Sequence, residues 1–144
     1  RHNEKRNPGS VCGHIRFGQS DLFEAVSEDD IIDVIMSNPP YVTESEYEEL
    51  RAEVREHEPK LALTAGEDGL DIYRRLIPEA AKHLPRGEQG GWLCMEIGYS
   101  QGSAVSELMQ QAGFTDVRVV KDLAGLDRVG IGNHRYRARG QSNV

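Results

Sequence analysis

The tetrapeptide Asn38-Pro39-Pro40-Tyr41, here called the proline loop, constrains this chain more than any other feature because it directly follows an apolar run at residues 31–37. An apolar run bounded by two prolines predicts a buried strand that ends abruptly in a loop. The prolines fix two φ angles and remove two backbone donors, and the residue before a proline is kept out of the helical region. We therefore expect Asn38 to lie extended at the carboxyl end of a strand, where open α/β sheets bind ligands.

The chemistry of this loop suits a planar amide or amino group. The side-chain oxygen of Asn38 and a backbone carbonyl left free by the prolines can accept two N–H bonds. The ring of Tyr41 can cover the flat face of the bound group. The alternative is a strand that merely ends in a Pro-rich turn and binds nothing.

Composition narrows the class of protein. The chain has 144 residues, of which 28% are charged and 38% hydrophobic, which predicts one globular domain with a sizeable core. The formal net charge of −7 argues against a broad nonspecific nucleic-acid surface. The two cysteines lie far apart and form no metal-ligand motif, so we expect no metal site and a reducing, cytoplasmic setting. We expect no membrane span, and a first residue other than Met suggests a boundary inside a larger protein.

Apolar periodicity predicts strands that alternate with helices. The expected strands are residues 15–19, 32–37, 92–98, 116–121 and 128–132, and the expected helices are 44–56, 71–84 and 103–112. Residues 22–26 are expected to be helix-like and residues 61–66 to form a loop, while 1–13 and 135–144 are expected to be loop or tail. This order predicts a mostly parallel α/β sheet, and the last two strands predict an antiparallel edge.

Several segments together resemble the release factor glutamine methyltransferases, a family that methylates the side-chain nitrogen of a glutamine. Besides the proline loop, they are Glu53-Val54-Arg55, Glu58-Pro59, Ala62-Leu63, residues 66–71, Tyr73-Arg74, Glu96-Ile97-Gly98, Gln101-Gly102, and residues 122–125 and 127–129. The resemblance runs from residue 10 to residue 133, and its segment 53–74 is specific to this family.

The resemblance implies a doubly wound, Rossmann-like class I methyltransferase domain that binds S-adenosylmethionine. Residues 1–144 would be the catalytic-loop half of that domain, because the family's Gly-rich cofactor loop and its ribose-binding acidic residue lie on two strands that precede the start of this chain. In the family these two strands lie between the strands expected here at 15–19 and 32–37. We therefore expect the strand at 32–37 to expose an unpaired edge, through which copies of the chain could associate.

The resemblance also implies the site residues. The catalytic and substrate-binding residues would be Asn38, Pro39, Pro40 and Tyr41. The cofactor would contact Asn38 and, on its adenine side, Asp21, Leu22 and Phe23. Several relatives carry Trp where this chain has Leu22, and leucine can pack on the purine face but cannot stack on it as a ring does. Glu96, at the end of a buried strand, would either orient the proline loop or cap loop N–H groups.

An amide nitrogen is a poor nucleophile because its lone pair is delocalised. We expect the side-chain oxygen of Asn38 and the carbonyl of Pro39 to bind the amide NH₂, which favours a pyramidal nitrogen and aims its lone pair at the sulfonium methyl. Tyr41 would pack on the amide plane and exclude water. Catalysis would then rest on positioning and electrostatics, without a strong general base.

Three functions remain open at this point. The first is methylation of the glutamine in the Gly-Gly-Gln motif of peptide chain release factors. The second is methylation of adenine in DNA or RNA, where the same loop would bind the amine of a flipped base, although the acidic balance and the segment 53–74 disfavour it and stable nucleic-acid binding is not expected. The third is a fragment that is inactive without its cofactor-loop half, and from which we expect weak or no cofactor binding.

Overall fold

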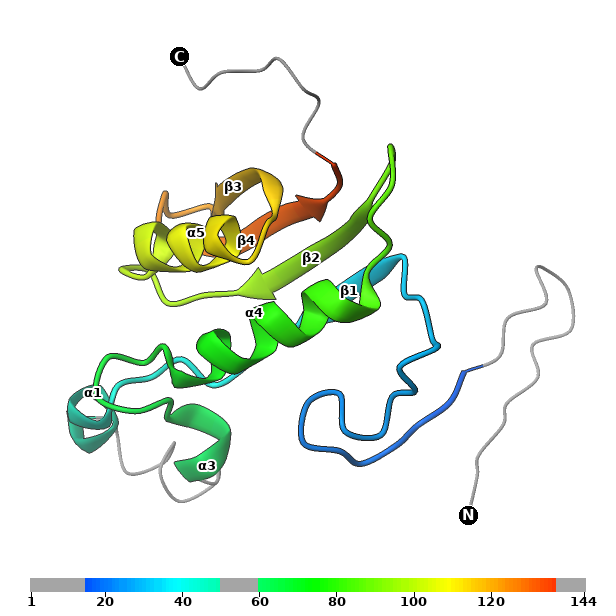
Figure 1. Ribbon diagram of the computed structural model, residues 1–144. Coiled ribbons are helices and arrows are strands. Elements are labelled where there is room, and N and C mark those ends of the chain that lie inside the picture. The colour runs from blue at the N-terminus through cyan, green and yellow to red at the C-terminus, as the bar shows by residue number, and fades with distance from the viewer. Residues whose placement is uncertain (1–14, 50–59, 137–144) are drawn as a thin grey trace, which may run out of the picture.

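The computed structural model describes residues 15–49 and 60–136. Four strands in these residues form one sheet in the order β1-β2-β4-β3 (Figure 1). They are β1 (Val34–Ser37), β2 (Gly91–Glu96), β3 (Thr115–Lys121) and β4 (Asp127–His134). β1 and β2 are parallel, whereas β4 is antiparallel to both β2 and β3. The antiparallel edge predicted from the sequence is therefore confirmed, whereas the prediction of a mostly parallel sheet is wrong for the described strands, of which only β1 and β2 pair in parallel.

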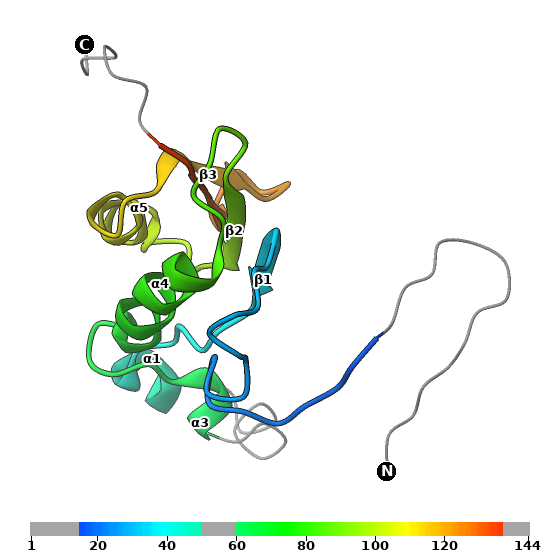
Figure 2. The ribbon, with the colours of Figure 1, turned by 45° about the vertical axis from the view of Figure 1, so that its right-hand side comes forward.

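The helices of the described residues are α1 (Glu44–Glu49), α3 (Lys60–Leu63), α4 (Asp71–His83) and α5 (Gly102–Gln111). Figure 2 shows α4 and α5 on the same side of the sheet. The apolar residues of α4 recur at helical spacing and are buried at Leu76, Ile77 and Ala80, so one stripe of the helix faces the strands. Pro78 lies inside α4 but on its exposed face, where water can satisfy the carbonyl that loses its N–H partner.

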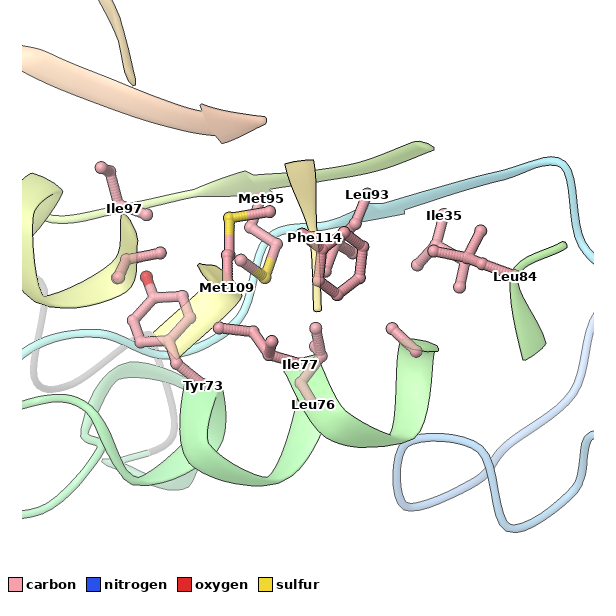
Figure 3. Close-up of a cluster of buried hydrophobic side chains, with 12 residues drawn as sticks. Ile35, Tyr73, Leu76, Ile77, Leu84, Leu93, Met95, Ile97, Met109 and Phe114 are labelled. Atoms are coloured by element: carbon pink, nitrogen blue, oxygen red, sulfur yellow. The ribbon is translucent and has the colours of Figure 1, made fainter. Parts of the chain in front are cut away.

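The hydrophobic core lies between these two helices and the sheet (Figure 3). On β2, Leu93 and Met95 are fully buried and alternate with the half-buried Trp92, Cys94 and Glu96, as expected for a strand with one covered face. The other strongly buried apolar side chains are Ile35, Tyr73, Leu76, Ile77, Ala80, Leu84, Ile97, Val105, Met109 and Phe114. The core therefore fixes β2, whose carboxyl end supports the proline loop.

The strand before the proline loop lies at the edge of the sheet. Among the described strands β1 pairs with β2 alone, which confirms the exposed edge expected from the sequence. Its outward side chains are uncovered, with Met36 81% exposed and Val34 51% exposed. The strand is also two residues shorter than the predicted 32–37, because its pairing with β2 begins only at Val34.

Other predictions from the sequence are wrong. Residues 15–20 form no strand, although apolar and polar residues alternate there, and both Ile15 and Phe17 are largely exposed. A strand is stabilised by its hydrogen-bonded neighbours, and this segment pairs with no described strand. The loop predicted at 61–66 is helical in its first part, where α3 ends at Leu63.

Other predictions fall partly outside the described residues. The helix predicted at 44–56 is described only as far as Glu49, and the tails at 1–13 and 137–144 are not described at all.

The helix-like segment predicted at 22–26 is also wrong. Residues 21–26 form turns, with hydrogen bonds from Glu24 N–H to the Asp21 carbonyl and from Val26 N–H to the Phe23 carbonyl. Within 15–49 and 60–136, no helix combines the length and apolarity that crossing a membrane requires.

Candidate active site

The proline loop begins where β1 stops pairing with β2, at the partners Ser37 and Met95. Asn38 is exposed, Pro39 is buried and Pro40 is half-buried. In the described part of the chain, neither the carboxamide of Asn38 nor the carbonyl of Pro39 takes part in a hydrogen bond. Two acceptor oxygens on adjacent residues at the carboxyl end of a strand thus have no hydrogen-bond partner among the described residues.

Tyr41 is held by its side chain. Its hydroxyl donates to the Glu96 carboxylate, with 2.9 Å between Oη and Oε1, and the Tyr73 hydroxyl donates to the backbone carbonyl of Glu96 at 2.7 Å. Burial and the hydrogen bond to Glu96 raise the pKa of Tyr41, against the opposing charge of Arg128, and burial also raises the pKa of Tyr73. Both hydroxyls therefore remain protonated donors across the ordinary pH range.

These contacts bear on the two interpretations of Glu96. An orienting role requires a contact between Glu96 and the proline loop, and the bond from Tyr41 supplies it. A capping role requires N–H groups that donate to the carboxylate, and the described residues contain no such bond. The geometry favours the orienting role.

Tyr41 is also held by its main chain. The Gln101 side chain donates to the Tyr41 carbonyl at 3.0 Å, and the following residue, Val42, exchanges backbone bonds with Leu63 and Ala65 at 2.9 and 3.0 Å. Sequence reasoning gave Gln101 no role. The available signal was a polar residue just after a buried strand, at the N-cap of α5.

A cavity of about 380 Å³ adjoins this end of the proline loop. It is lined by Tyr41, Val42, Thr43, Glu46, Glu49, Asp68, Gly98, Tyr99, Ser100 and Gln101. Three carboxylates lie on its wall, and one of them, Asp68, pairs with Arg74 at 2.5 Å. The space beside the loop is therefore acidic.

The residues expected to contact adenine, 21–23, lie against α4 and not beside the proline loop. Asp21 pairs with Arg75 at 2.8 Å, and the Phe23 ring stacks on His83 with 5.0 Å between ring centroids. Leu22 and Phe23 pack against the edge of the core. No hydrogen bond or ring contact among the described residues joins this segment to the proline loop. The structure thus brings Tyr41 and Glu96 together but leaves residues 21–23 separate from them.

The chain was compared with family models, curated proteins and solved structures. No family model matches the chain, whereas curated proteins of one name do. The release factor glutamine methyltransferase of Koribacter versatilis is 40% identical over 126 residues, which cover 88% of this chain and 43% of that protein. The protein of the same name from Caulobacter vibrioides is 48% identical over 103 residues, covering 72% of this chain and 35% of that protein. The chain thus spans less than half the length of these relatives.

Among solved structures, a methyltransferase from Pyrococcus furiosus aligns with 81% of this chain and 47% of its own, with a TM-score of 0.52 and 21% sequence identity. That likeness confirms the expected α/β fold. The sequence identities support the family. Over the residues that match, the chain therefore belongs to the release factor glutamine methyltransferase family.

Proposed function

We propose that this chain supplies the catalytic loop of an enzyme that transfers a methyl group from S-adenosylmethionine to the side-chain amide nitrogen of a glutamine in peptide chain release factors. The observation that carries the proposal is the pair of free acceptor oxygens on Asn38 and Pro39, beside a Tyr41 that is anchored at both its side chain and its carbonyl.

The two acceptors have distinct roles in the proposed reaction. The side-chain oxygen of Asn38 accepts one N–H of the substrate amide and the carbonyl of Pro39 accepts the other, so the nitrogen lone pair is turned away from the amide carbonyl. The half-buried ring of Tyr41 packs on the amide plane, while its hydroxyl is occupied by Glu96. The loop therefore acts by positioning and by electrostatics, and the surplus proton leaves after transfer.

The cofactor supplies an electrophilic methyl group when it is bound. The residues present fit its adenine end in part, since Asp21 offers a carboxylate and Leu22 and Phe23 offer apolar surface at the edge of the core. Asp21 already pairs with Arg75, so an adenine amino group would share that carboxylate or replace the guanidinium. No Gly-rich strand turn stands among the described residues to hold the amino-acid end.

The acidic cavity supports a protein substrate over a nucleic acid. Glu46 and Glu49 lie on the wall of the cavity beside Tyr41, where they would repel a phosphate backbone. The net charge of −7 acts in the same direction. Methylation of adenine in DNA or RNA therefore stays the weaker alternative.

A chimera gives the direct test, with this chain replacing the part of the Koribacter versatilis relative that it matches. Methyl transfer from labelled S-adenosylmethionine is measured to a release factor, to the same factor with its Gly-Gly-Gln glutamine changed to alanine, and to a single-stranded oligonucleotide. We expect label only on the first. Equal labelling of the first two would contradict the proposed glutamine, and labelling of the oligonucleotide alone would establish the adenine alternative.

The 144-residue chain by itself answers a separate question. We expect titration calorimetry with S-adenosylmethionine to detect weak or no binding, because the described residues fit only the adenine end. Tight binding would contradict this partial fit. Association through the free edge of β1 stays a prediction, and sedimentation of the chain over a range of concentrations tests it.

A further inference from the structure

The carboxamide of Gln101 joins three separate backbone segments. Its oxygen accepts the N–H of Gly98 at 2.9 Å, and its nitrogen donates to the carbonyls of Tyr41 at 3.0 Å and Gly69 at 3.2 Å. The residue is only 7% exposed, so these bonds lie away from water. The junction thus uses both donors and an acceptor of one buried side chain, which among residues of this length only glutamine provides.

Glycines at two of these positions make the close approach possible. Gly69 has a φ of +71°, and a Cβ there would lie 2.6 Å from the Gln101 nitrogen and also overlap the Tyr41 carbonyl. A Cβ at Gly98 would lie 3.0 Å from the Gln101 oxygen. Three stretches of the sequence resemblance, the proline loop, residues 66–71 and residues 96–102, therefore meet at this one carboxamide.

The junction lies at the exit of the proline loop. The entry of the loop is fixed by the pairing of Ser37 with Met95, and two proline rings restrict the backbone between entry and exit. The orientation of the Asn38 and Pro39 oxygens then depends on how firmly the exit is held. Glu96 holds the Tyr41 side chain, but only Gln101, among the described side chains, bonds to the Tyr41 main chain.

We propose that Gln101 is a positioning residue for methyl transfer. It sets the path of the main chain at Tyr41 and thereby the direction in which the two acceptor oxygens of the proline loop face the substrate amide. This inference rests on the proposed function and adds to it a residue that does not itself touch the substrate.

Gln101→Glu tests the role of the two donors. The carboxylate keeps an acceptor for Gly98 but faces the carbonyls of Tyr41 and Gly69 without a proton. In the chimera, kcat should fall at least about tenfold while the KM for S-adenosylmethionine changes less than about twofold. Burial raises the pKa of such a carboxyl, so protonation at lower pH restores one donor. The ratio of variant to unchanged kcat should therefore rise as the pH falls from about 8 to about 6.

Gln110→Glu is the matched control, because it makes the same change in charge at an exposed position of the same helix. It should leave kcat and its pH profile unchanged. A loss in Gln101→Glu that is independent of pH, or an equal loss in the control, would overturn the positioning role. If Gln101→Glu does not fold, Gln101→Met removes the same donors without adding charge, and its kcat and KM decide.

Hydrogen exchange in the 144-residue chain gives a measurement that needs no activity. The amides of Val42 and Ala65 donate across the exit of the proline loop and should exchange at least about tenfold faster in the Gln101 variants, while the Ala112 amide at the far end of α5, which donates to the Leu108 carbonyl, should not change. Unchanged exchange at Val42 and Ala65 would overturn the inference. Absence of methyl transfer by the unsubstituted chimera would overturn the proposed function and the catalytic part of this inference, and exchange would still show whether Gln101 orders the loop.

Discussion

The proline loop and the segment 21–23 are both joined to partners more than fifty residues away in the sequence, yet they are held in different ways. The half-buried Tyr41 bonds to the half-buried Glu96 and to the buried Gln101. Asp21 bonds to Arg75 on the surface, where their side chains are 54% and 48% exposed. Bonds between buried groups are costly to leave unmade, whereas exposed ion pairs exchange readily with water.

This difference bears on how the two halves of the proposed site assemble. The proline loop is ordered by β2, α5 and the turn before α4, all of which lie within the described residues. Among the described residues, the segment 21–23 is joined by side-chain contacts to Arg75 and His83 of α4 and packs against the edge of the core, and the strand expected before it does not form. The proposed acceptor side is therefore held by several elements of the described residues, whereas the proposed adenine side is held there by one exposed ion pair and one ring contact.

The largest effect is expected from a substitution that removes an acceptor of the proline loop and leaves the bonds of Tyr41 in place. In the chimera, Asn38→Ala should lower kcat at least about a hundredfold, the scale of one well-placed hydrogen-bonding group in a transition state. Gln19→Ala, which removes an exposed carboxamide outside the loop, should leave kcat unchanged. The measurement is initial-rate methyl transfer to a release factor, with the melting temperature as a check on folding. Near-normal turnover by Asn38→Ala would remove Asn38 from the proposed mechanism.

The next effect tests the anchor itself. Tyr41→Phe removes the donor to Glu96 and should lower the free energy of unfolding by about 1–2 kcal/mol, at the lower end of the range for hydrogen bonds to charged groups because both partners are only half-buried. Tyr99→Phe is the matched control, because the Tyr99 side chain is 61% exposed and its hydroxyl has no partner among the described residues. Urea unfolding of the 144-residue chain measures both. Equal stability of the two variants would mean that the bond from Tyr41 to Glu96 contributes nothing.

The sequence predicted the proline loop better than it predicted what holds the loop. An apolar run and two prolines act on the local backbone, so the strand and its end at Asn38 could be inferred from neighbouring residues. The predicted burial of that strand is wrong, because Val34 and Met36 lie exposed at the edge of the sheet. The bonds to Glu96 and Gln101 depend on the packing of β2 and α5, which no local pattern specifies. The strand at 15–19 failed for the opposite reason, because alternation is local but pairing requires a partner.

A smaller effect should appear in alkaline solution. The folded chain raises the pKa of both Tyr41 and Tyr73 above the ordinary value of 10.0, chiefly by burial. Above that pH the unfolded chain loses protons that the folded chain retains, so the free energy of unfolding should fall as the pH rises past 10.0. The decline should be shallower in Tyr41→Phe and unchanged in Tyr99→Phe. Urea unfolding at a series of pH values from neutral upward measures this decline. A decline of equal slope in all three proteins would show that Tyr41 does not contribute to the loss of stability at alkaline pH.

The smallest expected effect on folding belongs to the segment 21–23, where binding and stability should separate. Asp21→Asn breaks the ion pair with Arg75, and because both side chains are about half exposed the urea midpoint should not change measurably. If Asp21 contacts adenine, the same variant of the chimera should raise the KM for S-adenosylmethionine severalfold and leave kcat nearly unaltered. Asp30→Asn makes the same change in charge at an exposed position nearby and should alter neither quantity. An unchanged KM in Asp21→Asn would show that Asp21 forms the ion pair with Arg75 but does not contact adenine. The proposed adenine contact would then depend on Leu22 and Phe23 alone.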